Sequence, residues 1–269
     1  HASHPMLGAA DYKLVHHAAN GRAVYSFCMC PGGTVVAATS ETGRVVTNGM
    51  SQYSRNERNA NAGIVVGIDP GDYPTDAASF EDTLGQELGN AVRLDTRDTA
   101  DGFHRLAGMV LQRQLESAAY VAGGSNYQAP AQLVGDLLAG KPSTVLGDVE
   151  PSYKPGVHMT SFHNVLPAFA TDAMREALPV FGRKIKGFDR ADAVLTGVET
   201  RTSSPLRIER DVGLQSPTMR GLYPGGEGAG YAGGIVSAAM DGEKLADLIT
   251  TKYLRLKIIN LRHSISNLK

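Results

Sequence analysis

Residues 221–235 read GLYPGGEGAGYAGGI, a short apolar stretch that runs into a glycine cluster and then into an alanine-rich helical pattern. We predict a strand over Gly221–Tyr223, a glycine turn, and a helix that begins near Tyr231 and ends near Ile249. The N–H groups of the first helical turn and the helix dipole favour an anion, and glycines let it approach closely. This order of elements therefore predicts an anion-binding site.

The same stretch contains a dinucleotide-binding fingerprint, because Gly228, Gly230 and Gly233 follow the spacing G-x-G-x-x-G. A first βαβ unit also needs an acidic residue about 20 residues further on, and more strands after it. No acidic residue follows Asp247, and the sequence ends at Lys269. The fingerprint is therefore not the start of a Rossmann domain. Two interpretations stay open: contact with a nucleotide cofactor, and close strand–helix packing.

Residues 221–242, GLYPGGEGAGYAGGIVSAAMDG, closely resemble the C-terminal flavin-binding motif of a family of bacterial FAD-dependent dehydrogenases. The resemblance continues in order through YSFCMCPGG (25–33), AATSE (37–41), VTNGM (46–50), GGSNYQAPAQ (123–132), PSYKPGV (151–157) and ETRTSSP (199–205), and so spans about residues 8 to 249. Family members begin with a long N-terminal region that carries the ADP-binding G-x-G-x-x-G. This chain lacks that region, and its tail from Thr250 matches nothing in the family.

The resemblance implies that the complete protein is an oxidoreductase that binds FAD and a small-molecule substrate, with NAD(P)H as a candidate electron donor. We expect this chain to be its C-terminal fragment, inactive without the N-terminal region. The alternative is a non-catalytic folded remnant or a binding module without a cofactor. The residues that we expect to contact the flavin are Gly225, Gly226, Glu227, Gly228, Gly230, Tyr231, Ala232, Gly233 and Gly234. No catalytic acid or base can be named.

Composition argues against three other classes of protein: those that bind nucleic acid or a membrane surface, those that span a membrane, and those built on a disulfide scaffold. A net charge of −1 over 269 residues provides no basic field for nucleic acid or a membrane surface. We see no apolar run approaching the ~20 residues that span a bilayer. Two cysteines do not make a disulfide scaffold, so we expect a reducing, cytoplasmic setting.

The organisation predicts an α/β fold with an α+β insertion. Residues 8–75 are rich in short β-branched runs, which indicate an antiparallel sheet, and residues 80–182 are mainly helical. Strands return after residue 186. We therefore expect a mixed β-sheet and helix lobe of substrate type over 1–185, a partial Rossmann-like FAD/NAD(P)-binding segment over 186–249, and a divergent basic tail over 250–269.

Cys28 and Cys30 have three interpretations. They are buried structural thiols, a thiol close to a flavin, or zinc ligands together with His16 and His17. The spacing of two residues strains a disulfide and is too short for the usual zinc pattern, so we expect no metal site. We also count both cysteines among the candidates for a substrate pocket.

Two polar clusters complete the pocket candidates. Arg201, Ser203 and Ser204 suit a carboxylate or a flavin edge, but they also suit a solvated strand end. Asn126, Tyr127 and Gln132 follow a glycine pair, and either bind a substrate or form a turn before a helix. The basic tail is a strand, a short helix or a poorly ordered terminus.

Overall fold

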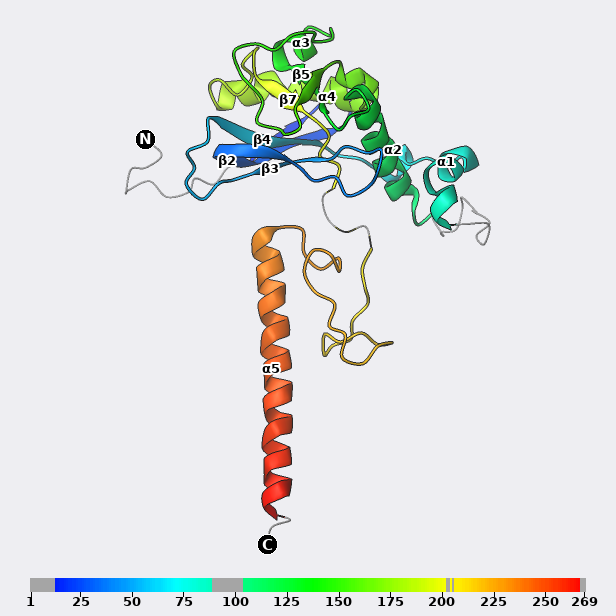
Figure 1. The fold of residues 1–269 in the computed structure, drawn as a ribbon, viewed down its shortest axis with the longest axis vertical. Coiled ribbons are helices and arrows are strands. Elements are labelled where there is room, and N and C mark those ends of the chain that lie inside the picture. The colour runs from blue at the N-terminus through cyan, green and yellow to red at the C-terminus, as the bar shows by residue number, and fades with distance from the viewer. Residues whose placement is uncertain (1–12, 89–103, 202–203, 205, 267–269) are drawn as a thin grey trace. The chain divides into compact units, whose positions relative to one another are not determined.

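The computed structural model of the chain describes residues 13–88, 104–201, 204 and 206–266, with residues 253–266 described by their backbone. The chain divides into two compact units, His1–Thr200 (unit 1) and Arg201–Lys269 (unit 2). Figure 1 shows the strands and most of the helices in unit 1, and one long helix in unit 2. Each unit is described separately below.

The first sheet of unit 1 has four antiparallel strands, which confirms the sheet predicted for residues 8–75. Its strands are β1 (Leu14–His17), β2 (Ala23–Ala37), β3 (Thr47–Met50) and β4 (Asn59–Val66). The long strand β2 pairs with all three others, and its register against β4 shifts on both sides of Cys30. The run Arg44–Thr47 also predicts a strand, but only Thr47 lies in β3. Val45 and Val46 are core residues outside the sheet, and their amides bond to Glu116 O and Thr39 Oγ1.

A second, mixed sheet has two strands in the part predicted to be mainly helical, and a third strand after residue 186, which confirms the predicted return of strands there. It has the order β6-β5-β7, with β5 parallel to β6 and antiparallel to β7. Its strands are β5 (Ala129–Leu133), β6 (Val157–Met159) and β7 (Val194–Thr196). The prediction missed β5 and β6 because they are short and β5 contains Pro130, a residue that weakens any strand assignment.

Apolar residues recur at three- and four-residue spacing over residues 106–118, and Val134, Leu137 and Leu138 mark a second, short segment, so both segments are predicted to be helices. The structure confirms both helices. The helices of unit 1 are α1 (Ala77–Leu88), α2 (Ala107–Ala122), α3 (Val134–Leu138) and α4 (Ala168–Lys184), with short 3-10 turns η1 (Pro70–Asp72) and η3 (Phe162–Asn164). Helix α4 buries Ala173, Ala177 and Phe181 against Leu14 of β1 and Val24 of β2. In Figure 1, α4 and the second sheet cover one face of the first sheet.

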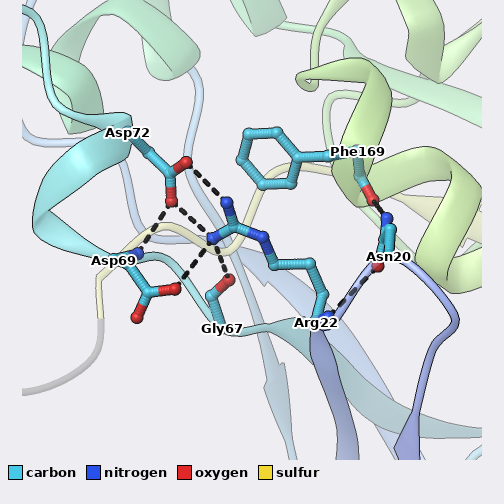
Figure 2. A network of polar contacts seen from close by, with 6 residues as sticks. All are labelled: Asn20, Arg22, Gly67, Asp69, Asp72 and Phe169. Carbon is cyan, nitrogen blue, oxygen red and sulfur yellow. Dashed lines mark hydrogen bonds and ion pairs between the residues drawn. The ribbon is translucent and has the colours of Figure 1, made fainter.

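Arg22 connects the first sheet to the η1 turn and to helix α4, as Figure 2 shows. Arg22, just before β2, donates from Nη1 and Nη2 to the two carboxylate oxygens of Asp72, at 2.6 and 2.7 Å. Its guanidinium also lies 4.2 Å from the centre of the Phe169 ring on α4. The bond from Arg22 lowers the pKa of Asp72. This network joins the β1–β2 turn, the η1 turn and α4, so it is structural.

Unit 2 differs from the prediction in three ways. Leu206–Glu209 and Gly221–Tyr223 are not strands, and no strand occurs in the described residues of this unit. Helix α5 (Ile235–Ser266) begins four residues later than predicted, because the Tyr231 amide bonds back to Gly226 O. It also continues past Ile249, since residues 250–266 contain no glycine or proline.

The described chain is therefore a mixed α+β structure with two sheets and five α-helices. A Rossmann-like sheet is not seen in the described part of unit 2. Although α5 has 32 residues, no helix in the described ranges is long and apolar enough to cross a membrane.

Candidate functional site

The glycine segment of unit 2 folds as consecutive turns ahead of α5. Gly226 has a φ of +68° and Gly230 a φ of +80°, conformations that favour glycine. The Gly230 amide donates to Glu227 O at 2.9 Å, and the Tyr231 amide donates to Gly226 O at 3.0 Å. Ala229 lies between these turns and is buried. The segment therefore has a defined shape of its own.

An ion pair between Arg210 and Asp241 holds these turns against α5. Arg210 donates to both carboxylate oxygens, at 2.9 and 2.7 Å, and to Pro224 O at 2.9 Å. The Gly226 amide donates to Asp241 Oδ2 at 2.9 Å. The bonds from Arg210 and then Gly226 lower the pKa of Asp241 to about 2. The guanidinium carbon of Arg210 lies 3.6 Å from the centre of the Tyr231 ring. The side chains of Arg210, Asp241 and Tyr231 and the backbone of Pro224 and Gly226 therefore stabilise the same turn.

Two glycines of the segment are explained by packing inside the unit. A side chain on Gly225 would collide with Leu245 of α5, and one on Gly230 would collide with the carbonyl oxygen of Leu206. These positions agree with the packing interpretation left open by the sequence. They do not require a cofactor.

Gly228 has no such explanation. A Cβ there would meet no atom within 4 Å, and its φ is outside the left-handed region. A Cβ on Gly234 would touch only Ser237 Oγ, at an ordinary 3.7 Å. Packing against the described residues of unit 2 therefore does not require glycine at either position.

The start of α5 also offers hydrogen-bond donors. In the described part of the chain, the amides of Ala232, Gly233, Ile235 and Val236 donate to no other residue. Gly233 and Gly234 are exposed, and Ile235 is 90% exposed. Free N–H groups at the start of a helix suit a phosphate or a carbonyl oxygen of a cofactor. The residues present thus fit a polar edge of FAD.

The side chains predicted to face the flavin have mixed surroundings. Glu227 is exposed, whereas the Tyr231 hydroxyl donates to Ile208 O at 2.9 Å and its ring supports Arg210 and Arg207. The sequence reasoning did not identify Arg210 or Asp241. They lie 31 residues apart, and no local pattern pairs them.

In unit 1, the predicted polar residues around 126–132 mostly bond within the protein. Asn126 Oδ1 accepts from the Gln128 amide at 3.0 Å, which is the turn alternative. Gln132 is fully buried, with Nε2 donating to Lys141 O and Oε1 accepting from the Phe162 amide. Tyr127 is 39% exposed, and its hydroxyl accepts from the Gly43 amide at 3.3 Å. Asn126 and Tyr127 are both exposed, whereas Gln132 is not accessible to a ligand.

The two cysteines lie on the part of β2 where the register against β4 shifts, and they differ in their exposure to solvent. Cys28 is exposed with a φ of +57°, while Cys30 is buried and its thiol donates to Cys28 O at 3.4 Å. Burial raises the pKa of Cys30, and the nearby charges of Cys28 and Glu199 add to that effect. His16 instead bonds to Glu176 at 2.8 Å. Among the described residues, no group of three or more His, Cys, Asp and Glu side chains is placed to hold a metal ion.

The third candidate cluster falls at the junction of the units. Ser204 Oγ donates to Leu206 O, Arg201 is half-buried and has a partner, and Ser203 lies outside the described residues. Just before them, Thr200 Oγ1 donates at 2.8 Å to Glu116, a fully buried carboxylate on α2. Sequence reasoning missed Glu116, because its position on α2 resembles that of any helix glutamate.

Two comparisons with known proteins bear on the family of the chain. The sequence profile of the family described as "FAD-dependent protein, C-terminal domain-like" matches residues 1–202, which end close to the boundary of unit 1. A curated protein of Clostridium beijerinckii is 46% identical over 252 residues, an alignment that extends into unit 2. The alignment covers 93% of this chain but 42% of that relative, so the chain spans less than half of the relative's length. This chain belongs to the family of FAD-dependent proteins with this C-terminal domain.

Proposed function

We propose that the chain is the C-terminal part of an FAD-dependent oxidoreductase, with unit 1 as the lobe of substrate type and unit 2 as the second flavin-contacting segment. The observation that carries this proposal is the start of α5. Four amides there have no acceptor among the described residues, and packing against those residues does not require glycine at Gly228 and Gly234. Family membership supports FAD as the group that fills this space.

The length of the relative supports an FAD site that is divided between this chain and another region of the complete protein. More than half of the Clostridium beijerinckii protein lies outside the match. Unit 2 shows one helix start with free donors and no strand in its described residues, which is too little to enclose a whole dinucleotide. We therefore assign the ADP half of FAD to the other region of the complete protein. The chain by itself should bind FAD weakly or not at all.

In the complete protein, the residues of this chain orient the cofactor. The amides of Ala232, Gly233 and Ile235 donate to a phosphate or a flavin carbonyl oxygen, and the dipole of α5 adds positive potential. Arg210 and Asp241 keep the turn in shape beforehand, which reduces the entropy lost on binding. The flavin supplies the electron transfer between a donor such as NAD(P)H and a small-molecule substrate.

Co-expression tests this proposal. The chain is produced together with the region of the Clostridium beijerinckii relative that lies outside the match, and the visible spectrum of the purified complex is recorded. The proposal predicts bound flavin in the complex and none with the chain alone. A stable complex without flavin would favour the alternative, a folded module that binds no cofactor.

A further inference from the structure

The part of the first sheet formed by β1, β2 and β4 has one face that packs against α4. Val24 of β2 and Val66 of β4 lie in the hydrophobic cluster of that helix, and Figure 1 shows α4 on this side of the sheet. Because successive side chains of a strand point to opposite faces, the neighbours of these residues point away from α4. They are Tyr25 of β2 and Val65 of β4, and Val15 of β1 is the register partner of Tyr25.

The face turned away from α4 is apolar as well. Val15, Tyr25 and Val65 form one row across three strands, and Phe27, two residues after Tyr25 on β2, lies opposite Gly63. We call Val15, Tyr25, Phe27 and Val65 the open face. None of these four side chains belongs to a hydrophobic core cluster of the described residues. Phe27 is 41% exposed, and the other three are partly exposed.

The composition of the open face is that of a covered surface. An antiparallel sheet with one face in solvent alternates apolar and polar side chains, whereas this part of the sheet is apolar on both faces. Charged groups border the open face. Lys13 Nζ lies 6.0 Å from the centre of the Tyr25 ring, and Glu199 Oε2 lies 3.8 Å from the position of a Cβ on Gly63. An apolar, aromatic centre with a polar border is typical of a surface that binds another protein region.

The length of the relative indicates which region covers the open face. The chain matches 42% of the Clostridium beijerinckii protein, so more than half of that relative lies outside the match. We propose that the open face docks against an apolar surface of this other region in the complete protein. Burial of Phe27 and Tyr25 then stabilises the contact between the two regions. This docking requires the second region that the proposed function assigns to the complete protein, but it requires no flavin.

Hydroxyl-radical footprinting tests this docking. The chain alone and its co-expressed complex with the other region of the relative are oxidised, and the modified peptides are measured by mass spectrometry. The oxidation rate of Phe27 should fall in the complex to that of Phe181, a fully buried phenylalanine. Leu146, in the loop after α3, is also 41% exposed and should keep its rate. Protection of Phe27 in the chain alone would assign the cover to the chain itself or to a second copy, and would overturn the inference.

The variants Phe27→Asp and Leu146→Asp provide the matched comparison, because the two side chains are equally exposed. A charge on the open face should weaken the complex at least about tenfold, and the same charge at Leu146 should leave it unchanged. Equal affinity of both variants, or failure of the two regions to associate, would contradict the inference. Should Phe27→Asp not fold, the footprint of the wild type still decides the matter.

Flavin content separates this inference from the proposed function. A complex that holds flavin while Phe27 is oxidised as fast as in the chain alone would reject the docking and keep the flavin-contacting role. A complex that protects Phe27 but holds no flavin would reject that role and keep the docking.

Discussion

Arg210 and Asp241 form a two-bonded ion pair, at 2.9 and 2.7 Å, that ties the loop before the glycine segment to the second turn of α5. Their side chains are 11% and 10% exposed. The same pair contacts the backbone of Gly226 and Pro224, so it fixes the shape of the segment.

Replacing Asp241 by Asn should loosen the segment. The variant loses the carboxylate charge that pairs with Arg210. The bond from Arg210 is the main cause that lowers the pKa of Asp241 from 3.8 to about 2, a shift that corresponds to about 2 kcal/mol. Hydrogen exchange at the Gly226 amide should then accelerate roughly 30-fold, because local opening becomes easier. Asp247→Asn, an exposed position on the same helix, is the control. Equal exchange in both variants would show that the pair does not hold the turn.

Acid should weaken unit 2 in a defined window. Because the folded-state pKa of Asp241 lies below its ordinary value of 3.8, its contribution is fully present above that value and is lost as the pH falls toward about 2. Exchange at Gly226, corrected for the intrinsic effect of pH, should rise over this interval in the wild type. Asp241→Asn should show no such rise, and a rise of the same size there would assign the effect to another group.

Substitutions at two glycines of the fingerprint should affect different properties, stability at Gly230 and flavin retention at Gly228. Gly230→Ala should destabilise unit 2 by at least about 1 kcal/mol, because its φ is +80° and a Cβ there collides with Leu206 O. Gly228→Val should leave stability unchanged but reduce flavin retention in the co-expressed complex, since the space around Gly228 is open. Denaturant unfolding and flavin content measure the two effects. Normal flavin content in a folded Gly228→Val complex would leave the glycine unexplained.

The cysteines should differ in reactivity. Cys28 is exposed, whereas Cys30 is buried and its pKa is raised by that burial. Iodoacetamide should therefore modify Cys28 in the native chain and Cys30 only after unfolding, as read by mass spectrometry of peptides. The Cys28→Ser/Cys30→Ser double variant of the complete protein should keep most of its flavin reduction. Rapid native modification of Cys30 would instead support a thiol close to the flavin.

The sequence predicted those parts of the structure that depend on local patterns. The β-branched runs within residues 8–75 indicate strands, and the three- and four-residue spacing of Leu111, Leu115 and Ala118 indicates α2. The sequence does not indicate β5, because five residues with a proline carry little signal. Gly221–Tyr223 is predicted to be a strand but lies in a loop, in which Leu222 bonds to Met219 and Ser216.

The site was predictable only in outline. The glycine spacing located the segment, but packing explains Gly225 and Gly230 while Gly228 stays open, a distinction that needs the surrounding atoms. The pairing of Arg210 with Asp241 depends on a contact between distant residues. Such contacts leave no periodic pattern in one sequence.

The most direct test of the flavin-contacting role is amide exchange at the start of α5. The co-expressed complex is compared with and without its flavin, and exchange is measured at Ala232, Gly233, Ile235 and Val236. We predict that flavin slows exchange at these four amides, because it accepts their free N–H groups, while the α2 amides of unit 1 do not change. A complex that holds flavin while these amides exchange as fast as before would contradict the account.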